Sequence, residues 1–191
     1  MPPSRNRGTL RLVAVFAVFS VAIAACLGAA APGVWLDVPF VRQQSNGCGA
    51  ACISMVMQYW LKSEDSAAEP AADAGRIQQA LYSTDARGIY ASDMERYFRE
   101  NGFRVFTFRG TPEELKHHLA NGRPLIVCLQ DSGKSGPLHY VVVVGVQGQD
   151  GVILVNDPAQ RKLLKMDLQN FETRWRPMHN WTLLALPEPA H

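Results

Sequence analysis

Three residues have the types and spacing that nucleophilic catalysis requires, namely Cys48, His139 and Asp157. Cys48 lies between two glycines at the start of a predicted helix, where free N–H groups and the positive end of the helix dipole stabilise a thiolate. His139 begins a run of valines, and Asp157 follows the next run of β-branched residues. If these runs pair as a hairpin centred near Gln149, His139 and Asp157 lie at the same end, as a base and its orienting carboxylate require.

The elements that must position these residues differ between the two halves of the chain. Apolar spacing predicts helices over 48–61 and 76–82. Two more helices are predicted from capping-box patterns: one opens at 92–95 and ends at 101–102, and the other opens at 111–114 and ends at 121–122. Strands are predicted over short runs bounded by Gly, Pro or Asp, at 103–108, 124–129, 139–146, 152–156, 162–166 and 181–185. Helices followed by strands predict an α+β fold with an antiparallel sheet.

Three blocks of sequence around these residues resemble one known family. The blocks are Val38-Pro39-Phe40-Val41-Arg42-Gln43 with Cys48-Gly49-Ala50-Ala51-Cys52, then 139–145 with Val155-Asn156-Asp157-Pro158-Ala159, and finally 167–175. Over about residues 36–176 they resemble the C39 cysteine peptidases, papain-like enzymes best known as the leader-cleaving domains of bacteriocin exporters. The resemblance implies a papain-like fold whose N-terminal helical part carries the Cys and whose C-terminal antiparallel sheet carries the His and Asp.

The same resemblance implies a role for each site residue. Cys48 is the expected nucleophile, His139 the general base and acid, and Asp157 the residue that orients the imidazole. Gln43 fits the family's Val-Pro-Phe-x-x-Gln pattern and is the preferred oxyanion-hole donor, with Gln44 as the alternative. The expected reaction is hydrolysis of a peptide or protein substrate through a thioacyl-enzyme intermediate, without a cofactor. The alternatives are a catalytically silent peptide-binding module and an acyl transferase or amidase of the papain-like class.

The chain also departs from the exporter members of that family. Gly47 stands where an Asp often precedes the nucleophile, and Ala50 stands where Pro is common. The 191 residues contain no ATP-binding motif and leave no room for an exporter membrane domain. The double-glycine leader specificity of the exporters is therefore not assumed.

Two other cysteines are interpreted as core residues. Cys52 lies one helical turn beyond Cys48, and Cys128 lies inside an apolar strand. A disulfide between Cys52 and Cys128 is open in an oxidising compartment, because sequence spacing cannot test it. No metal site is expected, since Cys48 and Cys52 lack the close Cys-x-x-Cys spacing of zinc ligands.

The N-terminus has the pattern of an export signal. Residues 1–25 contain three arginines and no acid, and the apolar run 12–25 has 14 residues. As a helix this run would span only ~21 Å of a hydrocarbon core that is ~30 Å thick. It therefore predicts a signal peptide and not a spanning helix.

The end of that signal resembles a bacterial lipobox. Ile23-Ala24-Ala25-Cys26 provides an aliphatic residue, two small residues and a Cys for acylation, and Leu27 in place of Asp indicates sorting to the outer membrane. We therefore expect a lipoprotein signal over 1–25, a tether over 26–33 and one peptidase domain over 34–188, anchored through Cys26 and facing the periplasm. The alternative is cleavage after one of residues 29–31, which gives a soluble secreted or periplasmic protein.

Composition limits the partners of the mature chain. The full sequence is 47% hydrophobic with a formal net charge of +2, as expected for a folded globular chain. Removal of residues 1–25 with their three arginines would change this charge to −1. Such a balance gives no electrostatic reason to expect nucleic acid as a partner.

Overall fold

The structure is a computed structural model that describes residues 33–61, 69–130, 137–148 and 151–189. The predicted signal peptide, the lipobox and Cys26 lie outside the described residues. The described residues belong to one compact unit, Gly33–His191. Within its described part, no helix has the length and apolar character needed to cross a membrane.

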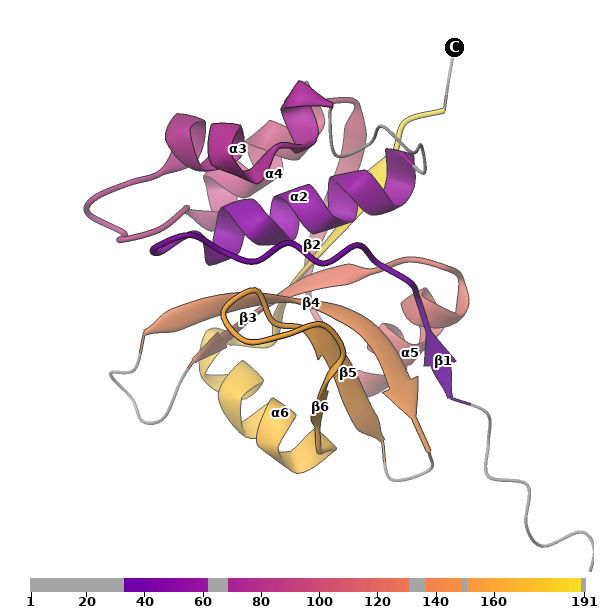
Figure 1. The fold of residues 1–191 in the computed structure, drawn as a ribbon. Coiled ribbons are helices and arrows are strands. Elements are labelled where there is room, and N and C mark those ends of the chain that lie inside the picture. Colours follow the sequence, from indigo (N-terminus) through magenta and orange to yellow (C-terminus); the bar gives the residue numbers. More distant parts are fainter. Residues whose placement is uncertain (1–32, 62–68, 131–136, 149–150, 190–191) are drawn as a thin grey trace, which may run out of the picture. The chain divides into compact units, whose positions relative to one another are not determined.

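One antiparallel sheet with helices on both faces forms this unit (Figure 1). Its helices are α2 (Cys48–Leu61), α3 (Ala74–Leu81), α4 (Ala91–Glu100), α5 (Pro112–Ala120) and α6 (Leu168–Trp175). Its strands are β1 (Val34–Trp35), β2 (Phe103–Arg109), β3 (Leu125–Gln130), β4 (Leu138–Gln147), β5 (Val152–Asn156), β6 (Leu164–Met166) and β7 (Trp181–Pro187). The strand order is β2-β7-β3-β4-β5-β6, and β1 pairs with β4. The predicted α+β class is confirmed.

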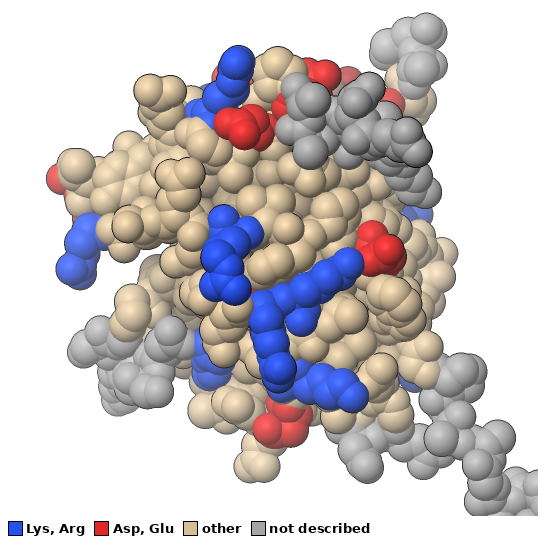
Figure 2. All heavy atoms as spheres, in the orientation of Figure 1, with Lys and Arg blue, Asp and Glu red and all other residues tan. Residues whose placement is uncertain are grey.

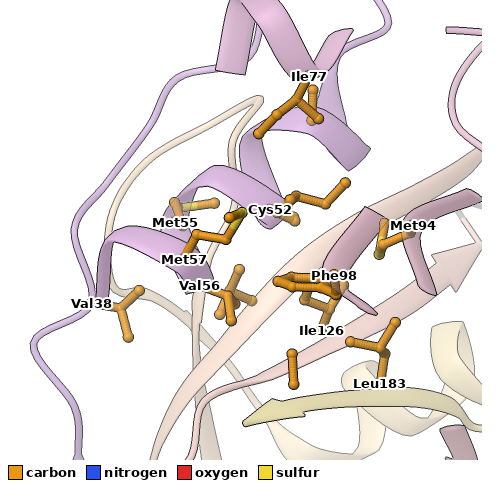
Figure 3. Close-up of a cluster of buried hydrophobic side chains, with 14 of the residues drawn as sticks. Val38, Cys52, Met55, Val56, Met57, Ile77, Met94, Phe98, Ile126 and Leu183 are labelled. Atoms are coloured by element: carbon orange, nitrogen blue, oxygen red, sulfur yellow. The ribbon is translucent and has the colours of Figure 1, made fainter. Parts of the chain in front are cut away.

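Two hydrophobic cores form because both faces of the central strands are buried. Along β3, Ile126 packs toward α2 and α4, whereas Leu125 and Val127 pack toward α5 and α6. This alternation follows from the two-residue period of a strand. Figure 3 shows the first core, where side chains of α2 and α4, such as Val56 and Phe98, meet those of the sheet. The helix that begins with Cys48 is therefore fixed to the sheet by apolar packing.

The helix starts follow the sequence in one case and depart from it in another. The capping box at Thr111 is present, because Thr111 Oγ1 accepts from Glu114 N–H at 3.2 Å and Glu114 Oε2 accepts from Thr111 N–H at 2.8 Å. The prediction of a capping box at Ser92 was wrong, because α4 begins at Ala91 and its N-cap is Tyr90. Glu95, which would have completed that box, instead pairs with Arg99 at 2.8 Å.

The hairpin predicted from the valine run is confirmed. β4 and β5 are antiparallel, with Val142 opposite Asn156, and the register shifts between Val143 and Gly145. Strand β1 and helix α6 were not predicted as elements. β1 has only two residues, which is too short a run to show a strand period.

Candidate active site

Cys48 is the first residue of α2 and follows a tight turn. Asn46 in this turn has a positive φ of 56°, a conformation that Asn adopts more readily than most residues. A Cβ on Gly47 would lie 3.1 Å from the Gln44 carbonyl oxygen, so the turn leaves little room for a side chain there. As the first helical residue, Cys48 has an N–H with no carbonyl four residues earlier in the helix to accept it. The half-buried thiol therefore lies beside a free backbone donor.

His139 and Asp157 are in direct contact. His139 Nε2 lies 2.7 Å from Asp157 Oδ1, and the side chains are 12% and 2% exposed. The hairpin register explains this contact. Val142 faces Asn156, and the bulge near Gly145 takes up an extra residue on β4. Asp157 is thus level with Val141, two residues from His139 on the same face of the hairpin, and the two side chains meet diagonally.

His139 also forms a hydrogen bond with the Cys48 thiol, so one imidazole links the thiol to the carboxylate. Burial alone would raise the pKa of Cys48. The hydrogen bond with His139, a backbone hydrogen bond from Tyr140 and the nearby imidazolium charge outweigh burial, and the pKa of Cys48 is lowered. A thiolate is thereby favoured below the usual cysteine pKa of about 8.5.

The same contacts stabilise the protonated imidazole. Burial alone would lower the pKa of His139, but its hydrogen bonds to Asp157 and Cys48 and their charges raise that pKa to about 9. The lowered thiol pKa and the raised imidazole pKa together favour a thiolate–imidazolium pair at neutral pH. This pair is the reactive form of a cysteine nucleophile with a histidine partner.

Two further donors hold the Asp157 carboxylate. Ala159 N–H donates to Oδ1 at 2.9 Å, and Gln160 Nε2 donates to Oδ2 at 2.7 Å. Burial alone would raise the pKa of Asp157, but the His139 hydrogen bond and charge and these two donors lower it. Sequence reasoning missed Gln160. The only signal for it is a polar side chain three residues after Asp157 in a turn, a common feature of turns.

Gln43 and Gln44 differ in their surroundings. Gln43 is half-buried, its N–H donates to Pro158 O at 3.0 Å, and Gln44 is exposed. The Gln43 Oε1 atom is buried without a hydrogen-bond partner, whereas its Nε2 is not among such atoms in the described part of the chain. Both residues line a hollow of about 180 Å³ that also reaches Gly47. Gln43 is thus the more buried of the two glutamines, and its role as oxyanion-hole donor stays a prediction.

Cys52 and Cys128 are buried free thiols. They do not form a disulfide with each other in this structure. Burial raises the pKa of Cys52 well above its usual value and that of Cys128 to about 12. Both thiols therefore stay protonated, as expected for core residues.

The fold is that of the papain-like class. The model of the Peptidase_C39 like family matches residues 35–183. The chain belongs to this family. The resemblance found in the sequence is thus confirmed, and so is the papain-like fold. A comparison with curated proteins found no significant match.

Solved structures agree on the fold. A double-glycine-motif protease from an AMS/PCAT transporter, solved in complex with the leader peptide, is 22% identical, with a TM-score of 0.60 over 81% of this chain and 94% of that one. A C39-like peptidase from Bacillus anthracis is 17% identical, with a TM-score of 0.61 over 83% and 99%. The peptidase domain of Streptococcus ComA is 17% identical, with a TM-score of 0.60 over 79% and 98%.

Proposed function

We propose that this protein is an exported cysteine peptidase that cleaves peptide bonds with Cys48, His139 and Asp157. The observation that carries the proposal is the position of His139, which contacts the Cys48 thiol on one side and Asp157 Oδ1 at 2.7 Å on the other. Membership in a family of C39-like peptidases supports the same reaction class.

The reaction would proceed in two steps. The Cys48 thiolate attacks the peptide carbonyl carbon, and the His139 imidazolium gives its proton to the leaving amine. His139 then takes a proton from water, which attacks the thioacyl carbonyl and releases the acid and the free thiolate. The Gln43 amide and the Cys48 N–H would hold the oxyanion, each donor being worth about 3 kcal/mol. Asp157 would keep the imidazole ring oriented throughout.

The test is digestion of a mixed peptide library by the intact protein and by Cys48→Ala. We expect new peptide ends with the unchanged protein and none with the variant, and the ends also define the sequence preference. Cys52→Ala is the matched control, because Cys52 is buried and its pKa is raised. Identical digests from the unchanged protein and Cys48→Ala would show that it is not a Cys48-dependent peptidase.

Alkylation separates this proposal from a silent peptide-binding module. At about pH 6 we expect iodoacetamide to label Cys48 faster than a free model thiol, because the thiol pKa is lowered. Labelling no faster than the model thiol would favour the silent module. Acyl transfer is distinguished by adding a primary amine to the digest, since a transferase would give amide products in place of free acids.

Export and anchoring form part of the proposal. The sequence pattern at 1–25 and the lipobox ending at Cys26 support a lipid-anchored protein on the periplasmic face of the outer membrane. A single anchored domain would then meet peptides of the cell envelope.

A further inference from the structure

Four exposed cations surround the loop that carries Asp157, and we call them the basic patch: Arg42, Arg161, Lys162 and Lys165. Figure 2 shows Lys and Arg side chains gathered on the face where β6 and the β5–β6 loop lie in Figure 1. Arg42 Nη2 donates to the Gln160 carbonyl oxygen at 3.1 Å, which ties the first cation to this loop. The patch is therefore one surface built from two distant parts of the chain.

Most of this positive charge is not neutralised. Lys162 Nζ pairs with Asp37 Oδ1 at 2.6 Å. Among the described residues, no carboxylate forms an ion pair with Arg42, Arg161 or Lys165. Like charges held together at a surface raise its positive potential and attract anions. The patch is thus suited to an anionic group from outside the chain.

The sheet register fixes where Lys165 stands. Lys165 lies opposite Leu154 on β5, and Leu154 packs in the core on the α2 side of the sheet. Directly opposed residues of antiparallel strands share a face. Lys165 at the edge strand β6 is therefore on the same side of the sheet as the helix that begins with Cys48.

The patch also borders the candidate active site through the backbone. Arg42 directly precedes Gln43, and the Gln43 N–H donates to Pro158 O at 3.0 Å. The Asp157 N–H donates to the Arg161 carbonyl oxygen at 3.1 Å. The backbone that carries the patch is therefore directly joined to the backbone of the candidate oxyanion donor and of Asp157.

We propose that the basic patch binds acidic side chains of the peptide substrate, within a few residues of the scissile bond. The proposal rests on the proposed function, because it requires a peptide in the cleft. An extended peptide advances about 3.3 Å per residue, so residues near the cleaved bond reach the rim of the cleft. The backbone continuity of the patch with Gln43 and Asp157 favours a peptide over a lipid headgroup.

The experiment scores Asp and Glu around the cleavage sites of the mixed peptide library. For the unchanged protein we expect these residues to be enriched on one side of the scissile bond. Exposed ion pairs each change affinity by about 1.4-fold to fivefold, so the loss of two of them in Arg161→Gln with Lys165→Gln should reduce the enrichment by about twofold to 25-fold. Raising the salt to about 1 M, where the Debye length is about 3 Å, should have the same effect in the unchanged protein.

Charge reversal gives the sharper prediction. Arg161→Glu with Lys165→Glu should shift the preference to peptides with Lys or Arg at the same positions. The matched control is Arg104→Gln with Lys116→Gln, which removes two exposed cations from β2 and α5 and should keep the acidic preference. An acidic enrichment that is equal in the unchanged protein and in Arg161→Gln with Lys165→Gln overturns the proposal.

A second measurement separates failure of this inference from failure of the peptidase proposal. The same library is passed over two immobilised proteins: Cys48→Ala, and Cys48→Ala that also carries Arg161→Gln and Lys165→Gln. The fraction of Asp and Glu in the retained peptides is then compared between the two proteins. This readout needs no hydrolysis. Co-sedimentation with phosphatidylglycerol vesicles tests binding to lipid. If Arg161→Gln with Lys165→Gln no longer sediments with the vesicles but keeps the peptide preference, the patch binds lipid and the inference is overturned.

Discussion

The Asp157 carboxylate is held from three directions. Oδ1 faces His139 Nε2 at 2.7 Å and the Ala159 N–H at 2.9 Å, while Oδ2 accepts from Gln160 Nε2 at 2.7 Å. These donors satisfy a carboxylate that is almost fully buried, which an isolated charge could not tolerate. They also fix its rotamer, so Gln160 acts as a positioning residue for the contact with His139.

Removal of the Asp157 charge should change how the site titrates. In Asp157→Asn the imidazolium loses its anionic partner, so we expect the pKa of His139 to fall from about 9 toward its ordinary value of 6.5. With less imidazolium beside it, the Cys48 thiolate loses a stabilising charge, and the pKa of Cys48 should rise. The thiolate–imidazolium pair would thus occupy a narrower pH range, limited from both sides. The rate of Cys48 alkylation, followed from about pH 5 to 10, measures this change.

Asp37→Asn provides the control for that titration. Asp37 is 74% exposed and pairs with Lys162 at 2.6 Å, and an exposed ion pair contributes at most about 1 kcal/mol. We expect its alkylation profile to overlay that of the unchanged protein. If the alkylation profile of Asp157→Asn also overlays that of the unchanged protein, the orienting role of Asp157 is contradicted.

Among the helices, the capping-box sequence patterns at Thr111 and Ser92 offer a matched pair of substitutions, because only the first forms a capping box. Thr111→Ala removes the hydroxyl that accepts from Glu114 N–H at 3.2 Å and should lower the free energy of unfolding by about 1 kcal/mol. Ser92 carries the same sequence pattern but is exposed inside α4. Ser92→Ala should therefore change the free energy of unfolding by less than about 0.5 kcal/mol. Urea unfolding measures both. An equal loss for the two variants would indicate that Ser92 does cap α4.

Local sequence predicted the elements with strong local signals. The bounds of α2 and β5 match the predicted runs at 48–61 and 152–156, because a helical apolar pattern and a bounded β-branched run are encoded within each segment. The start of α4 was mispredicted because its N-cap is Tyr90, whose side chain makes no capping hydrogen bond. A cap made by the backbone alone leaves no signature in the residue types.

Long-range order could not be predicted in the same way. β7 is the last strand in the chain, yet it lies between β2 and β3 in the sheet, and its neighbours are set by packing between distant segments. The contact of His139 with Asp157 was predictable because one hairpin joins them. The contacts of Gln43 with Pro158 and of Gln160 with Arg42 join segments more than a hundred residues apart. Nothing in the local pattern specifies them.

At the scale of the whole unit, the segment before α2 connects the two halves of the site. Leu36 N–H donates to Val144 O at 2.7 Å, and Asn156 Nδ2 donates to Val38 O at 3.1 Å. This segment therefore runs along β4 and β5 before it reaches Gln43. The candidate oxyanion donor is thus held against the strands that carry His139 and Asp157, and the core beneath α2 holds the nucleophile to the same sheet.

The location of the protein in the cell provides the last prediction. We propose that Cys26 carries the lipid anchor, because it follows a basic segment, an apolar run of 14 residues and a lipobox-like sequence. Each buried CH₂ of an acyl chain contributes about 0.8 kcal/mol, so stable retention requires more than one chain. Cys26→Ala should therefore abolish fatty-acid labelling and release the protein from the membrane fraction. Cys48→Ala, which removes a different thiol, should keep both. Fatty-acid labelling that persists in Cys26→Ala, or a mature N-terminus after one of residues 29–31 by mass spectrometry, would show ordinary secretion in place of anchoring.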